Sequence, residues 1–200
     1  AVVASAGSGK TGVITRRVQH LLALGVPPAR VLVVTFTKGA AEEMAGRLKV
    51  DIGCVSARSV VIRTFHSLSL SLCRAHAHLA GRANDFAVWT ERQQLVAVRH
   101  ALTEARVALS CADGDPAPPT LRAAATDPER MLTSIMRSKA LGPSRAARPD
   151  ELTARVLTRY DAILREANAL DMHDFLHVAA AALDASPALR AQLNGAHSHL

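Results

Sequence analysis

The segment Ala4–Thr11, with the sequence ASAGSGKT, constrains the fold of this chain more than any other. It fits the pattern of Ala or Gly, four residues of any type, then Gly-Lys and Ser or Thr. An apolar strand end at Ala1–Ala4 precedes Gly7 and Gly9, and apolar residues at helical spacing follow over Thr11–Leu24. A loop between a buried strand and a helix turns successive backbone N–H groups toward one point, and the helix dipole favours an anion there. The segment therefore predicts an α/β fold whose first loop binds nucleotide phosphates.

Each residue type in this loop has an expected role. Gly7 and Gly9 are small where backbone and phosphate approach closely, Lys10 brings a charge to the β and γ oxygens, and the Thr11 hydroxyl is placed to bind Mg²⁺. A Gly/Ser turn with a chance lysine is the alternative, but the flanking strand and helix disfavour it. We expect Lys10 and Thr11 to be catalytic, Thr11 to be the Mg²⁺ ligand, and ATP to contact Ala4, Ser5, Ala6, Gly7, Ser8, Gly9, Lys10 and Thr11.

Strands and helices alternate over the first 80 residues. After the first loop, apolar runs predict strands at Val31–Thr35 and Val60–Thr64, and helices at Ala40–Lys49 and from His66 to about Leu79. This order is typical of a parallel sheet with crossover helices.

The pattern changes at about Gly81. From there to Arg165 the sequence predicts helices and loops with no clear strand, and closing helices follow at Phe175–Leu183 and Pro187–Leu193. We therefore expect an α/β core at 1–80, a helical insertion at 81–165 and a return to the core at 166–200.

Hydroxyl and aromatic side chains follow both later strands. Phe36 and Thr37 end the first of them, and Thr64, Phe65 and His66 end the second. Ligands bind at the carboxyl edge of open α/β sheets, where Phe36 and Phe65 would stack on bases of a single strand and the neighbouring polar groups would reach its phosphates. For either phenylalanine alone, packing between sheet and helix is the simpler interpretation. The candidate nucleic-acid residues are Phe36, Thr37, Lys38, Thr64, Phe65 and His66.

Bulk features narrow the class of protein further. Lys and Arg outnumber Asp and Glu by 24 to 17, which favours an anionic partner. No apolar run is long enough to span a membrane.

Three scattered cysteines, Cys54, Cys73 and Cys111, indicate free thiols in a reducing, intracellular compartment. The histidine pairs at 76/78 and 197/199 are spaced for different helix faces, which disfavours metal binding.

Taken together, these segments resemble superfamily 1 helicases of the UvrD/Rep/PcrA type. The first loop is similar to motif I of that family, VTFTKGAAEEM at 34–44 to motif Ia, and TFHS at 64–67 to motif Ib. The resemblance continues through DFAVW at 85–89, IMRSK at 135–139 and NALDMHDFL at 168–176. Order and spacing agree along nearly the whole chain, which is more specific than any single motif.

The resemblance implies a 3′→5′ ATP-dependent helicase and translocase acting on single-stranded DNA and duplex junctions. In such enzymes ATP and Mg²⁺ bind between two RecA-like domains. The chain would then be the first RecA-like domain, a P-loop NTPase with a parallel sheet and an all-helical insertion subdomain, ending before the Walker B strand. Its partners would be DNA and the second RecA-like domain of a longer protein.

The sequence departs from the family pattern at a few points. Lys38-Gly39 stands where motif Ia has Asn-Lys, and Met172-His173 interrupts the acidic run near residue 171. The 200 residues contain no DExxQ motif, no glutamine motif and no arginine finger. In the family the glutamine motif reads adenine, and phosphoryl transfer requires the acidic motif and the arginine. We therefore expect the chain alone to bind nucleotide weakly and to hydrolyse it poorly. The helicase subunit of a RecB/AddA-type nuclease, a non-motor P-loop protein and a remnant that only binds DNA or a partner remain alternatives.

Overall fold

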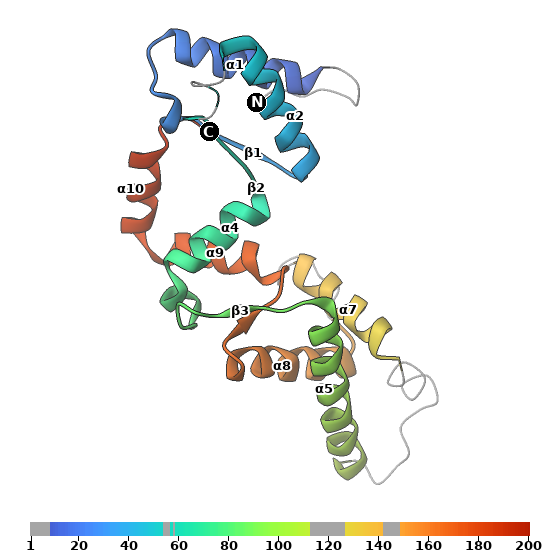
Figure 1. Cartoon of the computed structure of the whole chain (residues 1–200). Coiled ribbons are helices and arrows are strands. Elements are labelled where there is room, and N and C mark those ends of the chain that lie inside the picture. The colour runs from blue at the N-terminus through green and yellow to red at the C-terminus, as the bar shows by residue number, and fades with distance from the viewer. Residues whose placement is uncertain (1–8, 54–56, 58, 113–126, 142–148) are drawn as a thin grey trace. The chain divides into compact units, whose positions relative to one another are not determined.

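The computed structural model describes residues 9–53, 57, 59–112, 127–141 and 149–200. The chain divides into two compact units, which we call unit 1, residues 1–69 and 183–200, and unit 2, residues 70–182. The predicted strand at Ala1–Ala4 and the loop residues Ala4–Ser8 lie outside the described residues. Figure 1 gives the element labels that are used below.

Unit 1 is built on two parallel strands. Helix α1 (Lys10–Ala23), the 3₁₀ turn η1 (Pro28–Arg30), strand β1 (Leu32–Thr35), helix α2 (Lys38–Ile52) and strand β2 (Val61–Thr64) follow in order. Helix α4 (Phe65–Ala75) begins in this unit, and α10 (Pro187–Ala196) belongs to it. Strands β1 and β2 pair from Leu32↔Val61 to Thr35↔Thr64. This pairing matches the expected strand–helix–strand order at these positions.

A third chain segment adjoins β1 on the edge that β2 does not occupy. Val31 and His199 form a parallel bridge, in which Leu32 N donates to His199 O at 3.0 Å and His199 N donates to Arg30 O. Backbone groups of neighbouring residues in a strand point to opposite sides, and Val31 O accepts from Val61 N of β2. Strand β1 therefore has a parallel neighbour on each side.

The apolar faces of α1 and α2 close the core of unit 1. Val18 and Leu21 of α1 and Met44 and Leu48 of α2 are buried in one cluster with the apolar side chains of β1. These positions recur at three- and four-residue spacing, as expected for one face of a helix. Gly25, whose φ of 84° suits glycine, ends α1 and turns the chain toward β1.

Unit 2 is mainly helical. Its elements are η2 (Ala77–Ala80), β3 (Ala87–Val88), α5 (Glu91–Ala112), α7 (Pro128–Leu141), α8 (Glu151–Glu166), β4 (Ala169–Leu170) and α9 (Asp174–Ala185), whose last residues belong to unit 1. Helices α5, α7 and α8 pack together in Figure 1. Their core contains Val98, Ile135, Val156 and Tyr160, all fully buried. Within the described residues, no helix is long and apolar enough to cross a membrane.

The expectation of no strand between Gly81 and Arg165 is wrong at one place. Ala87–Val88 pairs in parallel with Ala169–Leu170, and Ala87 N donates to Asn168 O at 2.9 Å. A two-residue strand is too short to show the alternation by which strands are recognised. Asn168 adopts a φ of 46°, and its side-chain oxygen accepts from Ala83 N at 2.9 Å, which fixes the turn before β4.

A buried lysine joins three segments of unit 2. Lys139 Nζ of α7 lies 2.9 Å from Asp161 of α8, 2.8 Å from Asp171 and 2.7 Å from Asp174, at the start of α9. The hydroxyl of Tyr160 donates to Asp171 at 3.0 Å, and the Lys139 ammonium lies 4.9 Å from the Tyr160 ring centroid. We call these five residues the Lys139 cluster.

Charge in the Lys139 cluster is unbalanced, because three carboxylates surround one ammonium. Burial alone would favour the neutral amine of Lys139, but the carboxylates together raise its pKa above the usual value. Burial, reinforced by Asp171, raises the pKa of Asp174 although Lys139 opposes this. Burial, reinforced by the carboxylate of Asp171, also raises the pKa of the Tyr160 hydroxyl. The three carboxylates therefore keep Lys139 protonated, and its positive charge in turn stabilises them in their buried positions.

Replacing the lysine should destabilise unit 2 strongly. We expect Lys139→Met to lower the free energy of unfolding by about 3–5 kcal/mol, because the change leaves buried carboxylates without their counter-ion. Urea unfolding followed by circular dichroism measures the loss. Arg155→Met is the matched control, since it removes an exposed pair with Glu151 and should change little. A loss for Lys139→Met no larger than that of the control would contradict the expectation.

Candidate functional site

Three segments of unit 1 carry the residues predicted from the sequence to bind ligands. They are the start of α1, the corner between β1 and α2, and the corner between β2 and α4. Each places polar side chains where a strand or loop passes into a helix, so backbone N–H groups of the first turn are close by. Of the predicted phosphate loop, the structure describes Gly9, Lys10 and Thr11.

The start of α1 has the geometry that an anion-binding turn requires. Gly9 precedes the helix with φ 81° and ψ 21°, a left-handed conformation that glycine adopts without strain. Its carbonyl accepts from Val13 N at 3.2 Å, and the Thr15 hydroxyl donates to Thr11 O at 2.9 Å. The first turn contains Lys10 and no carboxylate, and Lys10 is exposed. The described residues of this turn therefore carry no negative charge that would repel an anionic ligand.

The corner between β1 and α2 exposes an aromatic ring. Phe36 is 84% exposed, which is unusual for a phenylalanine. Thr37 caps α2 by accepting from Ala40 N at 3.1 Å, and its carbonyl accepts from the Thr35 hydroxyl at 3.0 Å. Lys38 lies 3.7 Å from Glu42, with both side chains mostly in water. An exposed pair of this kind holds a lysine only weakly.

The corner between β2 and α4 is held by a reciprocal cap. Thr64 N donates to the Ser67 hydroxyl oxygen at 3.0 Å, and Ser67 N donates to the Thr64 hydroxyl oxygen at 3.1 Å. Phe65 is 40% exposed and His66 is half-buried. The Thr64 hydroxyl, predicted as a phosphate contact, thus already serves as an acceptor within the chain.

The two aromatic rings meet. Because Thr35 pairs with Thr64 in register, the residues that follow them leave the sheet side by side. The ring centroids of Phe36 and Phe65 are 5.1 Å apart with an interplanar angle of 44°, within the range of favourable aromatic pairs. The structure therefore brings these two predicted residues together and leaves Phe36 open to solvent.

Sequence reasoning missed two features. Ser67 was seen only as part of TFHS, although a hydroxyl three residues after Thr64 is a capping pattern that could have revealed its role. Lys139 was noted only within IMRSK, and its ion pairs with Asp161, Asp171 and Asp174 span too many residues for spacing to reveal them. Asp171 also binds the backbone at the start of α9, since its side chain accepts from Asp174 N at 3.0 Å.

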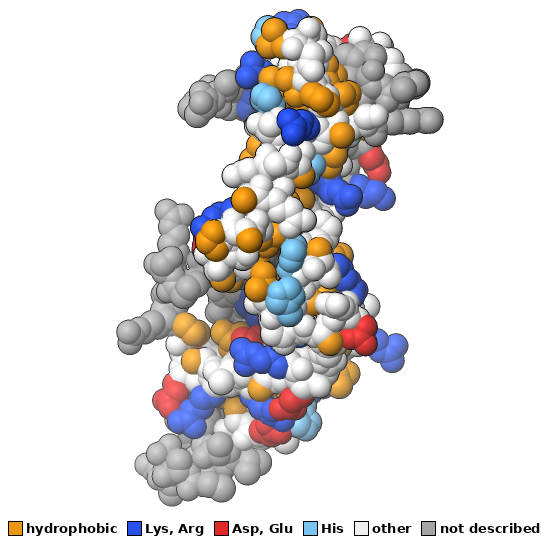
Figure 2. All heavy atoms as spheres, turned by 90° about the vertical axis from the view of Figure 1, so that its left-hand side faces the viewer, with side chains coloured by type: hydrophobic (Ala, Val, Ile, Leu, Met, Phe, Trp, Pro, Cys, Tyr) orange, Lys and Arg blue, Asp and Glu red, His pale blue; other side chains and the backbone are white. Residues whose placement is uncertain are grey.

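The excess positive charge belongs to unit 1. This unit contains 10 Lys and Arg against 4 Asp and Glu, whereas unit 2 contains 14 against 13. Figure 2 shows basic and acidic side chains interspersed over the lower helices, which belong to unit 2. An anionic ligand is therefore attracted to unit 1 more than to unit 2.

Comparison with known proteins decides the family. The model of the UvrD/REP helicase N-terminal domain matches residues 1–200. The chain belongs to the UvrD/REP helicase N-terminal domain family.

Several curated helicases from bacteria are similar to this family member. It is 29% identical over 183 residues to ATP-dependent DNA helicase PcrA of Leuconostoc citreum, covering 88% of this chain and 23% of that protein. It is 29% identical over 187 residues to ATP-dependent DNA helicase Rep of Escherichia coli K12, covering 88% and 25%. It is 33% identical over 194 residues to ATP-dependent DNA helicase UvrD1 of Mycobacterium bovis, covering 93% and 24%. The chain thus spans about a quarter of the length of these relatives.

Exposure of the Phe36 ring has a direct consequence for stability. We expect Phe36→Ala to change the free energy of unfolding by no more than about 0.5 kcal/mol, because the ring buries little surface. Phe86→Ala, which removes a fully buried ring, should cost about 3–5 kcal/mol. Thermal and urea unfolding of both variants gives the comparison. Comparable losses would mean that Phe36 is a packing residue and would remove the reason to seek a ligand for it.

Proposed function

We propose that this chain is the N-terminal, ATP-binding portion of an ATP-dependent DNA helicase that moves 3′→5′ along single-stranded DNA in repair or replication. The observation that carries the proposal is the family match over residues 1–200, with Lys10 and Thr11 in the first turn of α1. The names of the PcrA, Rep and UvrD1 relatives as ATP-dependent DNA helicases support both ATP use and a DNA substrate. An intracellular location follows from that substrate.

ATP and Mg²⁺ fit the residues at the start of α1. The left-handed Gly9 has open space around it, since an added Cβ would meet no atom within 4 Å. Lys10 would hold the β and γ phosphates and the Thr11 hydroxyl would bind Mg²⁺, a cation that prefers oxygen ligands. The bound ion would neutralise charge on the phosphates during transfer. In this proposal the loop Ala4–Ser8, outside the described residues, completes the phosphate site.

The proposed architecture is a RecA-like core at 1–80 and 166–200 that carries the insertion 81–165. The parallel pair β1–β2 with α2 as its crossover, and the parallel bridge from Val31 to His199, support such a core. Hydrolysis would need a second RecA-like domain, which would contribute an arginine to the transferring phosphoryl group.

Single-stranded DNA is the proposed ligand of the two corners. Exposed Phe36, paired with Phe65, offers a surface for base stacking. Lys38 and His66 flank the rings on the first turns of α2 and α4, where they would meet phosphates together with the Thr37 and Thr64 hydroxyls. The concentration of positive charge in unit 1 supports a polyanion at this site.

Nucleotide binding tests the role of α1. We expect Lys10→Ala to weaken binding of a fluorescent ATP analogue in the presence of Mg²⁺ by about tenfold or more, since it removes the charge that meets the β and γ phosphates. Lys49→Ala, an exposed lysine near the end of α2, is the matched control. Equal affinities for the two variants would refute phosphate binding by this turn.

DNA binding tests the aromatic pair separately. We expect the double variant Phe36→Ala with Phe65→Ala to lose about 1–3 kcal/mol of oligo(dT) binding free energy per stacked base. Leu24→Ala, which truncates another exposed apolar side chain of unit 1, should bind normally. Fluorescence anisotropy at several salt concentrations measures both effects. Affinity that does not fall as salt rises would argue against phosphate contacts, and unchanged affinity of the double variant would argue against stacking.

A further inference from the structure

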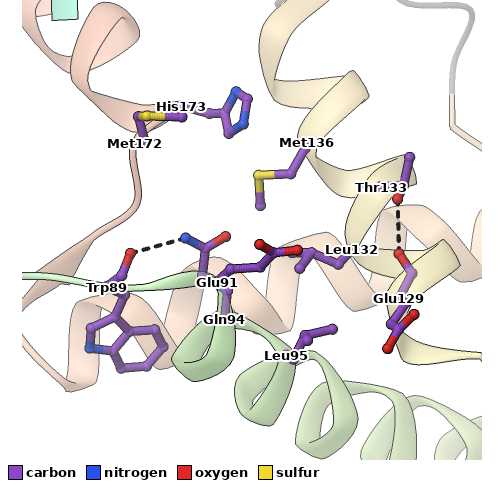
Figure 3. Close-up of a pocket in the computed structure, with 10 residues that line it drawn as sticks. All are labelled: Trp89, Glu91, Gln94, Leu95, Glu129, Leu132, Thr133, Met136, Met172 and His173. Atoms are coloured by element: carbon purple, nitrogen blue, oxygen red, sulfur yellow. Dashed lines mark hydrogen bonds between the residues drawn. The ribbon is translucent and has the colours of Figure 1, made fainter.

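A groove crosses unit 2, and none of the residues of the proposed nucleotide and DNA sites lines it. Its volume is about 660 Å³, and it lies between the start of α5, the middle of α7 and the turn before α9. Figure 3 shows Met136 extending from α7 into the space between the turn that carries Met172 and His173 and the Gln94 side chain of α5, while the Trp89 ring points away from that space and packs against the core of unit 2. The volume is in the range that accommodates several side chains of a ligand.

The floor of the groove is apolar and adaptable. It contains Trp89, Leu95, Leu132, Met136 and Met172. Leu132 is buried, whereas Met172 is 51% exposed, so a thioether lies at the surface without covering. Methionine side chains are unbranched and polarisable, and they adjust to apolar groups of different shapes. An apolar side chain of a partner therefore gains contacts here that water does not supply.

Hydrogen bonds hold the walls of the groove in place. Gln94 Nε2 donates to the Trp89 carbonyl at 3.0 Å, which fixes the start of α5 (Figure 3). His173 N donates to Asp171 Oδ1 at 2.8 Å, and the Lys139 cluster ties this turn to α7. A groove whose walls are already fixed loses little conformational freedom when it binds a ligand.

The rim of the groove is acidic. Glu91 lies at the start of α5 and Glu129 at the start of α7, and both are exposed. Among the described residues neither carboxylate has an ion-pair partner, and the described lining contains no Lys or Arg. The nearby Arg130, which is exposed and lies next to Glu129, pairs with Asp127 at 3.2 Å, so the acidic excess of the rim is small. In a chain with an overall charge of +7, this groove presents apolar surface beside unpaired negative charge, a combination that repels nucleic acid phosphates.

We propose that the groove binds a basic amphipathic helix of a protein partner. Apolar side chains at i, i+3 and i+4 of that helix would rest on Leu95, Met136 and Met172, beside Trp89, as in other helix-in-groove complexes. Lysine or arginine side chains on its flanks would face Glu91 and Glu129. Because opposite charges attract, the two carboxylates favour a basic partner and increase its rate of association. This inference does not depend on ATP or DNA binding by unit 1.

Trp89 provides the measurement, because it is the only tryptophan of the chain. The 200-residue chain is titrated with a synthetic helical peptide of about 15 residues that has Leu at i, i+3, i+4 and i+7 and Lys elsewhere. A matched peptide carries Glu in place of every Lys. We expect the lysine peptide to shift Trp89 emission to shorter wavelength and to saturate at micromolar concentration, and the glutamate peptide to leave it unchanged.

Paired variants test whether the rim carboxylates are responsible. The double variant Glu91→Gln with Glu129→Gln should raise the Kd of the lysine peptide by about tenfold. Glu151→Gln with Glu166→Gln, which removes the same charge from exposed positions of α8, should leave the Kd unchanged. Three results would overturn the proposal: no response of Trp89, equal binding of the glutamate peptide, or equal weakening by both double variants.

Discussion

The register between β1 and β2 is the constraint on which the candidate site of unit 1 depends. Because Thr35 is opposite Thr64, both strands end at the same level of the sheet, and both following residues are phenylalanines. A shift of one residue would separate the rings and would move the first turns of α2 and α4 away from each other. The hydroxyl caps at Thr37 and Thr64 then begin each helix within two residues of the end of its strand. Two short strands and two caps are thus enough to build a shared surface.

Unit 2 depends on a different kind of interaction. Its helices share a core that consists mainly of Ala, Leu and Val side chains, but their meeting point is polar, where Lys139 contacts three aspartates. Apolar packing alone tolerates sliding of one helix along another, whereas an ammonium with three fixed acceptors specifies a single arrangement. The same contacts position the turn that carries Met172 and His173. The shape of the groove in Figure 3 is therefore linked to buried charge.

Local patterns in the sequence predicted most of the regular elements, and long-range contacts explain what they missed. The apolar runs at Val31–Thr35 and Val60–Thr64 correspond closely to β1 and β2. The pairing of Ala87–Val88 with Ala169–Leu170 joins residues about eighty positions apart, and two-residue strands have no period. Motif spacing predicted that Phe36 and Phe65 lie at one edge of the sheet. Their ring contact could not be predicted without the register of β1 and β2. The partners of Lys139 could not be predicted without the tertiary structure.

The Phe36 ring also affects how the protein behaves in solution. A ring that is 84% exposed presents apolar surface to every other molecule, including further copies of the same chain. The positive charge of unit 1 opposes self-association, since copies with the same charge repel each other when counter-ions are scarce. Added salt screens this repulsion while the ring stays equally apolar. Added salt therefore weakens the repulsion between copies of the chain as well as any electrostatic binding.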